Sequence, residues 1–477
     1  MSLPIVSRQR LAKGVLALVA LGGLLLSLPA LADSQARIVR LSDVEGTIRI
    51  DRNVGQGYEK AFLNMPITAG TKIWAKEDGR AEVEFEDGSI LHIVPDTKVS
   101  FSALSMRDSG GKLTTVDVEK GTAYLSYLGK GEDEFTVNFG HESATLAKAA
   151  HFRIDLNDQE SELSVFKGEL EVRGPAGSVQ VEKDHSVTFD LNDDDRYKLA
   201  SDIEPGPYDE WDKQQVQYHE RDYNAKANGP SIPYGYGVSD LNFYGNYYSV
   251  PGYGYFWQPY FANMAWDPFG DGAWMWYPGF GYAFVSAYPW GWMPYRYGSW
   301  EFVPGFGWGW QPGGFSSWQP VPAVNNPPQR TGLPQPPTAP GHGTVVVGRG
   351  PVVPVVGGPP RRIMISQGSA GLGVPRGAVS DLAKASRQVS EKGSTTIHTS
   401  SSFRSAMTPP MTFGSFGIPA RGGITSHSSF AAHSGFGASG GHGSSGAHMS
   451  TGSHMSMSSH SSSSSASHSS SSSSSHH

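Results

Sequence analysis

Residues 79–94 have the sequence GRAEVEFEDGSILHIV, and they decide the fold of the N-terminal half of the chain. Apolar and polar residues alternate from Ala81 to Phe85, a pattern typical of a half-buried strand. Glu86-Asp87-Gly88 supplies side chains that tolerate a tight turn, and a second apolar run follows from Ser89 to Val94. The stretch therefore predicts a β-hairpin.

The same alternation continues on both sides of this hairpin, from Arg37 to about Asp190. Short alternating runs bounded by turn residues indicate about a dozen short strands, and hence an all-β domain within residues 33–200. We expect its carboxylates to point outward from the strands and to pair with Lys or Arg of the same runs. The predicted strands lie at 38–41, 46–50, 81–85, 89–94, 115–118, 123–127, 135–139, 152–156, 163–166, 170–173, 178–181 and 186–189.

Four stretches of this domain resemble the FecR family. Residues 66–73 (PITAGTKI), 79–91 (GRAEVEFEDGSIL) and 96–99 (DTKV) look like the family's core, and residues 165–172 (VFKGELEV) resemble its closing strand pair. The resemblance implies a roll or solenoid of short strands that acts in the periplasm, where family members relay a signal from an outer-membrane receptor to a sigma factor. Only about a dozen residues precede the apolar N-terminal segment, so the resemblance does not extend to a cytoplasmic domain that binds the sigma factor.

Charge and motifs exclude several classes of function. Residues 33–235 contain 38 acidic and 23 basic residues, a net charge of −15, and the remainder carries +8. This acidic domain lacks the clustered bases that bind nucleic acid. The chain has no cysteine, no G-x-S-x-G, no H-E-x-x-H and no phosphate loop. We therefore expect no enzyme activity, no cofactor and no nucleic-acid partner.

Residues 1–32 have the pattern of a cleavable signal peptide. Arg8, Arg10 and Lys13 precede an apolar run over residues 14–29, and Ala30-Leu31-Ala32 forms a small-x-small cleavage site. The pattern predicts a periplasmic or extracellular protein with no stable membrane span after cleavage. The alternative is an uncleaved anchor, because the run approaches the about 18–20 residues that span a bilayer.

Residues 201–235 form the predicted linker between two folded regions. Residues 209–223 lack Gly and Pro and mix charges at helical spacing, which indicates one short helix. Inside the β domain, Asp155 to Glu162 offers oxygen ligands at a spacing that suggests calcium. It lacks the glycine and the final glutamate of a calcium loop, so a polar hairpin turn is the favoured interpretation.

Residues 236–319 contain an aromatic unit repeated three times. The motif Pro-Gly-aromatic-Gly begins at Pro251, Pro278 and Pro304, with spacings of 27 and 26 residues. A fixed period in this range predicts a small β-repeat array whose units bury their apolar faces on one another. Residues 274–281 (WMWYPGFG), 289–298 (PWGWMPYRYG) and 300–308 (WEFVPGFGW) also resemble a bacterial family of unknown function that often follows FecR modules in exported proteins.

The rings of this region allow two interpretations, which are not exclusive. Aromatic side chains on rigid turns can stack on sugar faces or enclose a quaternary ammonium. The alternative is that the rings form the core of the array, because few aliphatic residues are present to do so. The candidate stacking residues are Trp274, Trp276, Trp292, Trp300, Trp308, Tyr253, Phe280 and Phe306.

Residues 320–477 are rich in Pro, then in Gly, Ser and His, and their composition predicts disorder. Residues 380–392 are the exception and favour a transient helix. Scattered histidines between His427 and His477 could bind Zn²⁺, Ni²⁺ or Cu²⁺ weakly, but a solubilising spacer is the favoured interpretation.

These patterns lead to one main functional hypothesis and two alternatives. The main hypothesis is a non-catalytic exported envelope protein whose FecR-like β module mediates protein–protein interaction or envelope sensing through an exposed strand edge. The first alternative is a cell-wall or polysaccharide-binding protein that acts through the aromatic repeats. The second is a purely structural surface protein.

Overall fold

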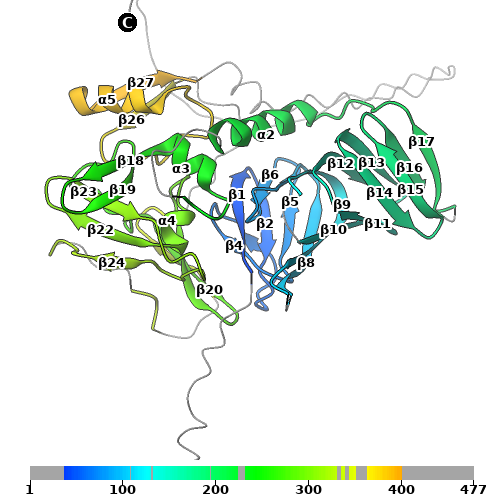
Figure 1. The fold of residues 1–477 in the computed structure, drawn as a ribbon, viewed down its shortest axis with the longest axis horizontal. Coiled ribbons are helices and arrows are strands. Elements are labelled where there is room, and N and C mark those ends of the chain that lie inside the picture. The colour runs from blue at the N-terminus through cyan, green and yellow to red at the C-terminus, as the bar shows by residue number, and fades with distance from the viewer. Residues whose placement is uncertain are drawn as a thin grey trace, which may run out of the picture. The chain divides into compact units, whose positions relative to one another are not determined.

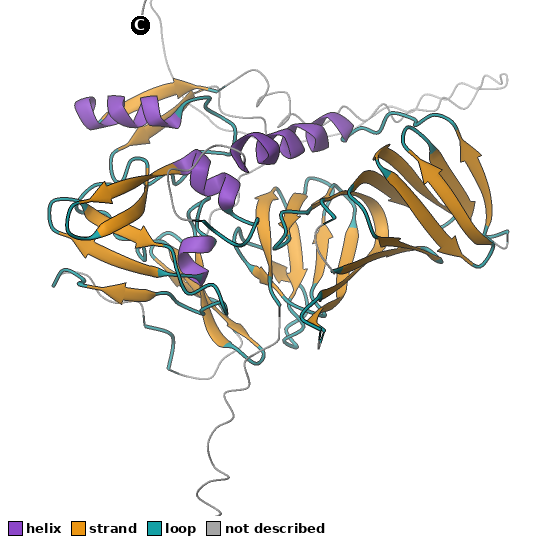
Figure 2. Cartoon of the chain, viewed as in Figure 1, coloured by secondary structure: helices purple, strands orange, loops and turns teal. Residues whose placement is uncertain are grey.

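The computed structural model describes residues 37–399, apart from gaps at 108, 130–132, 194, 224–230, 330–334, 339–342 and 351–361. All described residues belong to one compact unit, Met1–Phe413, which is mainly β and confirms the predicted fold class (Figure 2). The predicted signal peptide and the histidines from His427 onward lie outside the described residues. Among the residues described, no helix has the length and apolar character needed to span a bilayer.

Seventeen strands between Val39 and Ala200 form the first domain, here called the β roll. They are β1 (Val39–Glu45), β2 (Ile48–Asp51), β3 (Glu59–Lys60), β4 (Pro66–Ile67), β5 (Lys72–Ala75), β6 (Arg80–Glu84), β7 (Ile90–Ile93), β8 (Lys98–Met106), β9 (Lys112–Tyr127), β10 (Glu134–Phe139), β11 (Glu142–Leu146), β12 (Ala150–Leu156), β13 (Glu160–Lys167), β14 (Glu169–Gly174), β15 (Gly177–Glu182), β16 (Ser186–Asp190) and β17 (Arg196–Ala200).

The roll consists of two sheets that share β9 (Figure 1). One sheet has the order β3-β2-β5-β8-β9-β10-β11-β14-β15. The other has the order β4-β1-β6-β7-β9-β12-β13-β16-β17. Two separate strands were expected at 115–118 and 123–127, but both belong to β9. This strand passes from one sheet to the other near Gly121, whose φ of +88° favours glycine.

The hairpin expected at residues 79–94 is present as β6 and β7, with Glu84 opposite Ile90. The expectation that its carboxylates point into solvent is wrong. Glu82 and Glu84 are almost completely buried, because other parts of the chain cover this face of the sheet. The polar turn expected near residues 155–162 is confirmed, since the Asn157 side chain accepts hydrogen bonds from the backbone N–H groups of Gln159 and Glu160.

The helix expected after the roll is confirmed as α2 (Asp209–Tyr223), and α3 (Val238–Tyr244) follows it. Helix α2 packs on the roll: it buries Trp211, Asp212, Tyr218 and His219. The segment therefore covers the β6–β7 face, although the sequence indicated only a linker.

The three aromatic repeats form the second domain, here called the aromatic domain. Each repeat makes one hairpin of it. The hairpins are β18 (Gly245–Val250) with β19 (Gly254–Pro259), β20 (Gly272–Tyr277) with β21 (Gly281–Ser286), and β22 (Ser299–Val303) with β23 (Gly307–Gln311). Between the strands, Pro occupies the second turn position and Gly the third, with φ of +81°, +78° and +84° at Gly252, Gly279 and Gly305. This is the arrangement of a type II turn, which requires positive φ at its third residue.

The rest of the aromatic domain holds these hairpins together. The short helix α4 (Met293–Arg296) lies between the second and third hairpins. Strand β24 (Ala323–Asn325) extends the sheet β18-β19-β23-β22, and β25 (Val345–Val347) pairs with β20.

The predicted disorder beyond residue 320 is wrong for β24 and β25, and it is also wrong for residues 362–399. They form β26 (Arg362–Ser366), α5 (Leu382–Lys392) and β27 (Ser394–His398). Helix α5 confirms the helix expected at 380–392: Asp381 accepts a hydrogen bond from the backbone N–H of Lys384 at its start. Residues 362–399 are ordered because they bury apolar side chains against the aromatic domain, among them Ile365, Val374, Leu382 and Val389. From residue 400 onward, the prediction lies outside the described residues.

Candidate functional site

The candidate stacking tryptophans lie mostly inside the aromatic domain. Trp292 and Trp300 are fully buried, and Trp274 and Trp308 are at most 3% exposed. For these four rings the structure favours the second interpretation, because they pack with other aromatic side chains into one core, here called the aromatic core. Four of its indole N–H groups, those of Trp257, Trp290, Trp300 and Trp310, donate to backbone carbonyls, as in the 2.9 Å bond from Trp300 Nε1 to the Pro294 carbonyl.

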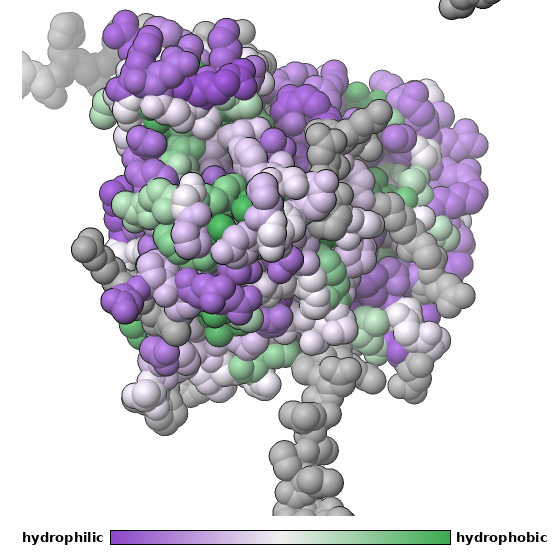
Figure 3. Space-filling view, turned by 60° about the vertical axis from the view of Figure 1, so that its left-hand side comes forward, coloured by the Kyte–Doolittle hydropathy of each residue, from purple (hydrophilic) through white to green (hydrophobic). Residues whose placement is uncertain are grey.

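The other candidates are more accessible. Trp276, Phe280 and Phe306 are half-buried, and Phe280 packs on Trp318 with ring centroids 4.6 Å apart. Tyr253 is 45% exposed at the tip of the first hairpin. Sequence reasoning missed Tyr248 and Tyr255 on the same hairpin, which are 37% and 56% exposed. The face drawn in Figure 3 carries its hydrophobic residues in small separate groups.

One end of the β roll is closed by the aromatic domain. The hairpin β20–β21 contributes Met275, Tyr277 and Val285 to the core of the roll. At this closed end, Asn64 Nδ2 donates hydrogen bonds to the carbonyls of Ser286 and Tyr288, at 3.1 and 2.8 Å. The second hairpin thus serves as a cap for the first strands of both sheets.

The other end of the roll is not closed in the same way. Strands β15 and β17 are the last strands of the two sheets and lie at the same end (Figure 1). Among the described residues, β15 pairs only with β14, and β17 pairs only with β16. Tyr197 and Leu199 of β17 are 41% and 49% exposed. We call β15, β17 and these two side chains the open end.

A buried network of charged side chains joins the roll to the rest of the chain. His92 of β7 bonds through Nδ1 to Asp212 of α2 at 2.6 Å and through Nε2 to Glu82 of β6 at 3.0 Å. His219 Nε2 lies 2.9 Å from Glu82 Oε1, and His151 Nε2 lies 2.8 Å from Asp212 Oδ2. We call this network the junction. Its members are Arg40, Glu82, Glu84, His92, His151, Asp212, His219, Asp240 and Arg376.

Two arginines complete the junction. Arg376 donates to Glu82 at 2.7 Å and to both carboxylate oxygens of Asp240 at 3.2 Å. Arg40 pairs with Asp240 at 2.6 Å and with Glu84 at 3.0 Å. Arg376 lies in the segment between β26 and α5, so a residue from the region predicted to be disordered neutralises the carboxylates of the roll.

Pairing in the junction shifts the pKa values of its members. Burial alone would lower the pKa of His92, but its hydrogen bonds to Asp212 and Glu82 outweigh burial and raise the pKa to about 9. Burial opposes ionisation of Asp240 and Glu82 as well, yet Arg376 and its neighbours hold both pKa values below the usual range. His92, Glu82 and Asp240 are therefore charged at neutral pH.

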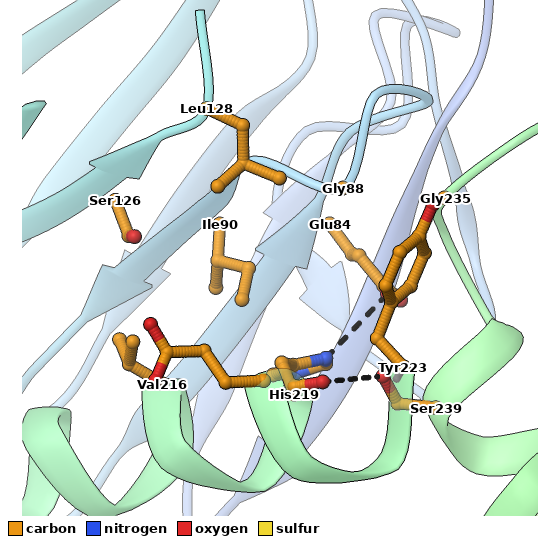
Figure 4. Close-up of a pocket in the computed structure, with 11 residues that line it drawn as sticks. Glu84, Gly88, Ile90, Ser126, Leu128, Val216, His219, Tyr223, Gly235 and Ser239 are labelled. Atoms are coloured by element: carbon orange, nitrogen blue, oxygen red, sulfur yellow. Dashed lines mark hydrogen bonds and ion pairs between the residues drawn. The ribbon is translucent and has the colours of Figure 1, made fainter. Parts of the chain in front are cut away.

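A cavity of about 130 Å³ adjoins the junction between the roll and α2 (Figure 4). Ile90, Leu128 and Val216 supply apolar walls, and His219 and Glu84 belong to its lining. Leu128 is 41% exposed. Despite these acidic and imidazole groups, no metal-binding cluster of His, Asp and Glu occurs in the part of the chain that the structure describes.

Two segments of the chain match known families. Residues 71–171 match the FecR protein family, and residues 238–333 match a family of unknown function, DUF6600. The chain carries a FecR domain followed by a DUF6600 domain. The FecR domain lies within the β roll, and the DUF6600 domain includes all three aromatic hairpins. Arg376 and α5 lie beyond both matches.

Similar solved structures exist for part of the chain, but the similarity is low. Two crystal structures of a "putative anti-sigma factor" from Parabacteroides distasonis match with 16% and 14% identity and a TM-score of 0.24. Each match covers 28% of this chain and 59% of the other, so the chain spans less than two thirds of their length. A TM-score of 0.24 is too low to assign a function. No curated protein matches the chain.

Sequence reasoning missed the contact between the two domains. Glu82 and Glu84 of the FecR domain alternate with Val83 as surface residues would, and Arg376 is a single base in a Gly- and Pro-containing segment. One signal was available in helix α2, where the charged or polar residues Asp212 and His219 directly neighbour the aromatic residues Trp211 and Tyr218. A helix with buried aromatic and charged residues indicates packing on a polar face.

Proposed function

We propose that this protein is a non-catalytic envelope protein whose β roll, which contains the FecR domain, docks a partner protein at its open end. The observation that carries the proposal is the difference between the two ends of the roll. The chain closes one end with its own hairpin β20–β21. The other end presents two strand edges that no described residue pairs with, and two exposed apolar side chains. The FecR match supports a regulatory or sensing role.

An unpaired strand edge is a natural docking site. Its backbone N–H and C=O groups can hydrogen-bond an added strand without any special side chain. Rolls and solenoids of stacked strands also need a cap at each end, because the last layer would otherwise leave apolar side chains in water. Tyr197 and Leu199 are such side chains, and a partner strand at the open end would cover them.

The junction has a supporting role in this proposal. Its buried ion pairs attach α2, α3 and the Arg376 segment to the FecR domain, so these parts and the DUF6600 domain accompany the FecR domain when it docks. The signal-peptide pattern of residues 1–32 supports docking in the periplasm or outside the cell. N-terminal sequencing of the protein from an envelope fraction should give Asp33 as the first residue.

Site-specific photocross-linking in intact cells tests the docking site. A photoreactive phenylalanine analogue placed at Tyr197 should give a cross-linked product of defined mass, and the substitution Leu199→Lys should abolish that product. The control position is Met364 on β26, which is 78% exposed and distant from the roll strands in sequence. Equal cross-linking from both positions, or none from Tyr197, would refute docking at the open end.

A second candidate function rests on the exposed tyrosines of the first aromatic hairpin. Tyr248, Tyr253 and Tyr255 are the accessible rings of the first aromatic hairpin, and rings of this kind can stack on sugar faces. Phe306 extends this group, since its ring centroid is 5.9 Å from that of Tyr248. These rings favour a glycan as the ligand of the DUF6600 domain.

Pull-down on insoluble peptidoglycan and polysaccharides tests the glycan hypothesis. The double variant Tyr253→Ala, Tyr255→Ala should lose binding, whereas Tyr58→Ala should keep it, because Tyr58 is a tyrosine of the roll with 39% exposure. Binding that survives the double variant would exclude these rings as the glycan site.

A further inference from the structure

The inner side of β17 continues the core of the β roll without being covered. Tyr197 lies opposite Phe189, and Leu199 lies opposite Val187 in the register of β16 and β17. Directly opposed residues project from the same face of a sheet. Phe189 and Val187 are buried, whereas Tyr197 and Leu199 are exposed. A strand added beyond β17 would therefore place its own apolar residues on the inner side, next to these two.

The outer side of β17 is basic. Arg196 lies opposite Asp190 and pairs with Asp193 at 3.1 Å. Lys198 lies opposite Thr188 and has no ion pair among the described residues. On an added strand, the outward residues would lie beside Arg196 and Lys198. Opposite charges on neighbouring strands stabilise the pair, and like charges destabilise it.

The second free edge has a different character. On β15, Val179 and Val181 are already buried, and the outward residues are Ser178, Gln180 and Glu182. This edge offers neither exposed apolar side chains nor a basic side. An acidic strand should therefore bind more tightly to the β17 edge than to the β15 edge.

A second copy of the chain is a poor occupant for the β17 edge. Antiparallel pairing of β17 with itself would bring Arg196 and Lys198 of one copy close to those of the other. Basic residues on edge strands are a common protection against such self-pairing. The charge of the edge thus favours a different protein.

We propose that the β17 edge binds an extended segment of a partner protein in which apolar residues alternate with aspartate or glutamate. The apolar residues cover Tyr197 and Leu199, and the carboxylates pair with Lys198 and Arg196. This inference rests on the proposed docking at the open end and specifies the chemistry of the partner.

Peptide binding to the full chain tests this proposal. The probes are a short fluorescent peptide of alternating valine and glutamate and its counterpart of valine and lysine, both with blocked ends, measured by fluorescence anisotropy. We expect the glutamate peptide to bind about tenfold more tightly, since two cross-strand charge pairs change sign between the peptides. Lys198→Glu should remove or reverse the preference.

Two control variants make the result specific. Lys384→Glu makes the same change of net charge on the exposed face of α5, and it should leave the preference unchanged. Leu199→Lys should weaken the binding of both peptides. A preference for glutamate that Lys198→Glu leaves intact would overturn the inference.

The remaining outcomes separate this inference from the proposed function. Equal binding of both peptides, lost in Leu199→Lys, would overturn the acidic preference but keep docking at the open end. No binding of either peptide would count against both. A dimer in sedimentation that Leu199→Lys dissociates would identify a second copy as the occupant and refute the inference.

Discussion

Arg376 Nη1 donates a 2.7 Å hydrogen bond to Glu82 Oε1, although 294 residues separate the two in the sequence. Glu82 is completely buried, and the Arg376 side chain is 10% exposed. The guanidinium also contacts Asp240 and the Ser42 carbonyl, so one side chain links β6, β1 and α3. The FecR domain therefore depends on a residue that lies outside both matched families.

Replacing Arg376 should destabilise the protein strongly. Arg376→Met keeps most of the side-chain volume but leaves Glu82 and Asp240 without this cation, and breaking a buried ion pair from one side costs about 3–5 kcal/mol. Urea unfolding followed by tryptophan fluorescence should show a lower midpoint. Arg387→Met, on the exposed side of α5, should unfold like the unchanged protein. Equal midpoints for the two variants would contradict a stabilising role for Arg376.

The stability of the protein should fall as pH rises from about 6.5 to about 9. The pKa of His92 is about 9 in the folded chain against an ordinary value of 6.5, so its contribution is complete below pH 6.5 and lost as pH passes through 9. The shift corresponds to roughly 3 kcal/mol. Glu45 acts in the same direction, because burial and the neighbouring Asp43 raise its pKa to about 8.

His92→Gln provides the check on this pH dependence. The variant should be less stable at pH 6 and should show a smaller loss of stability between pH 6.5 and 9, measured as the urea midpoint at each pH. The loss of stability that remains in the variant should come from deprotonation of Glu45, whose pKa is about 8 in the folded chain. A variant with an unchanged pH profile would show that His92 is not the titrating group.

Acid should weaken the junction through its carboxylates. Burial disfavours the charged forms, but His and Arg partners hold the pKa values of Glu82, Asp212 and Asp240 below the usual range. Groups with lowered pKa stabilise the fold above their ordinary pKa, and the contribution is lost as pH falls through the folded value. Stability should therefore decrease below about pH 4. Asp240→Asn should reduce this acid dependence, measured by thermal unfolding between pH 3 and pH 6.

Truncation of a ring in the aromatic core should affect folding rather than ligand binding. Trp300→Ala removes a fully buried indole and its hydrogen bond to the Pro294 carbonyl, at an expected cost of about 3–5 kcal/mol. Tyr253→Ala, at an exposed turn, should change stability by less than about 0.5 kcal/mol. Thermal unfolding would distinguish the two interpretations of the rings, and a neutral Trp300→Ala would argue that the ring is not part of the core.

Two glycines with positive φ should respond differently to alanine. Gly279 has φ of +78° and open space at its Cβ position, so Gly279→Ala should cost about 1–2 kcal/mol of backbone strain. Gly298 has φ of +70°, but a Cβ there would lie 2.2 Å from the Gln311 carbonyl oxygen. Gly298→Ala should therefore cost considerably more, because β23 must also move. Similar unfolding midpoints for the two variants would disprove this difference.

The local structure of the chain was largely predictable from short patterns. The β6–β7 hairpin, the helix over 209–223 and the three hairpins of the aromatic repeats follow from alternation, the absence of helix breakers and the Pro-Gly turns. Each of these signals lies within a few neighbouring residues. Strand β17 was missed because it follows an aspartate-rich turn and has a basic side, so it gives a weak strand pattern.

The candidate sites were less predictable, because they depend on contacts between distant segments. The residues next to Glu82 in the sequence give the alternating pattern of a surface position. Glu82 is buried because α2, α3 and Arg376 pack over it. Whether each tryptophan ring points into the core or to solvent also depends on contacts between distant segments, here the packing between hairpins. Average composition beyond residue 320 also concealed the few apolar residues that order 362–399, such as Ile365 and Val389.

The distance in sequence between Glu82 and Arg376 has a consequence for the order of synthesis. A chain is made from its N-terminus, and domains generally fold in that order. Glu82 and Asp240 are therefore present well before the guanidinium that neutralises them. The junction cannot reach its final charge balance until Arg376 has been added, which makes assembly of this interface one of the last events in the maturation of a newly made molecule.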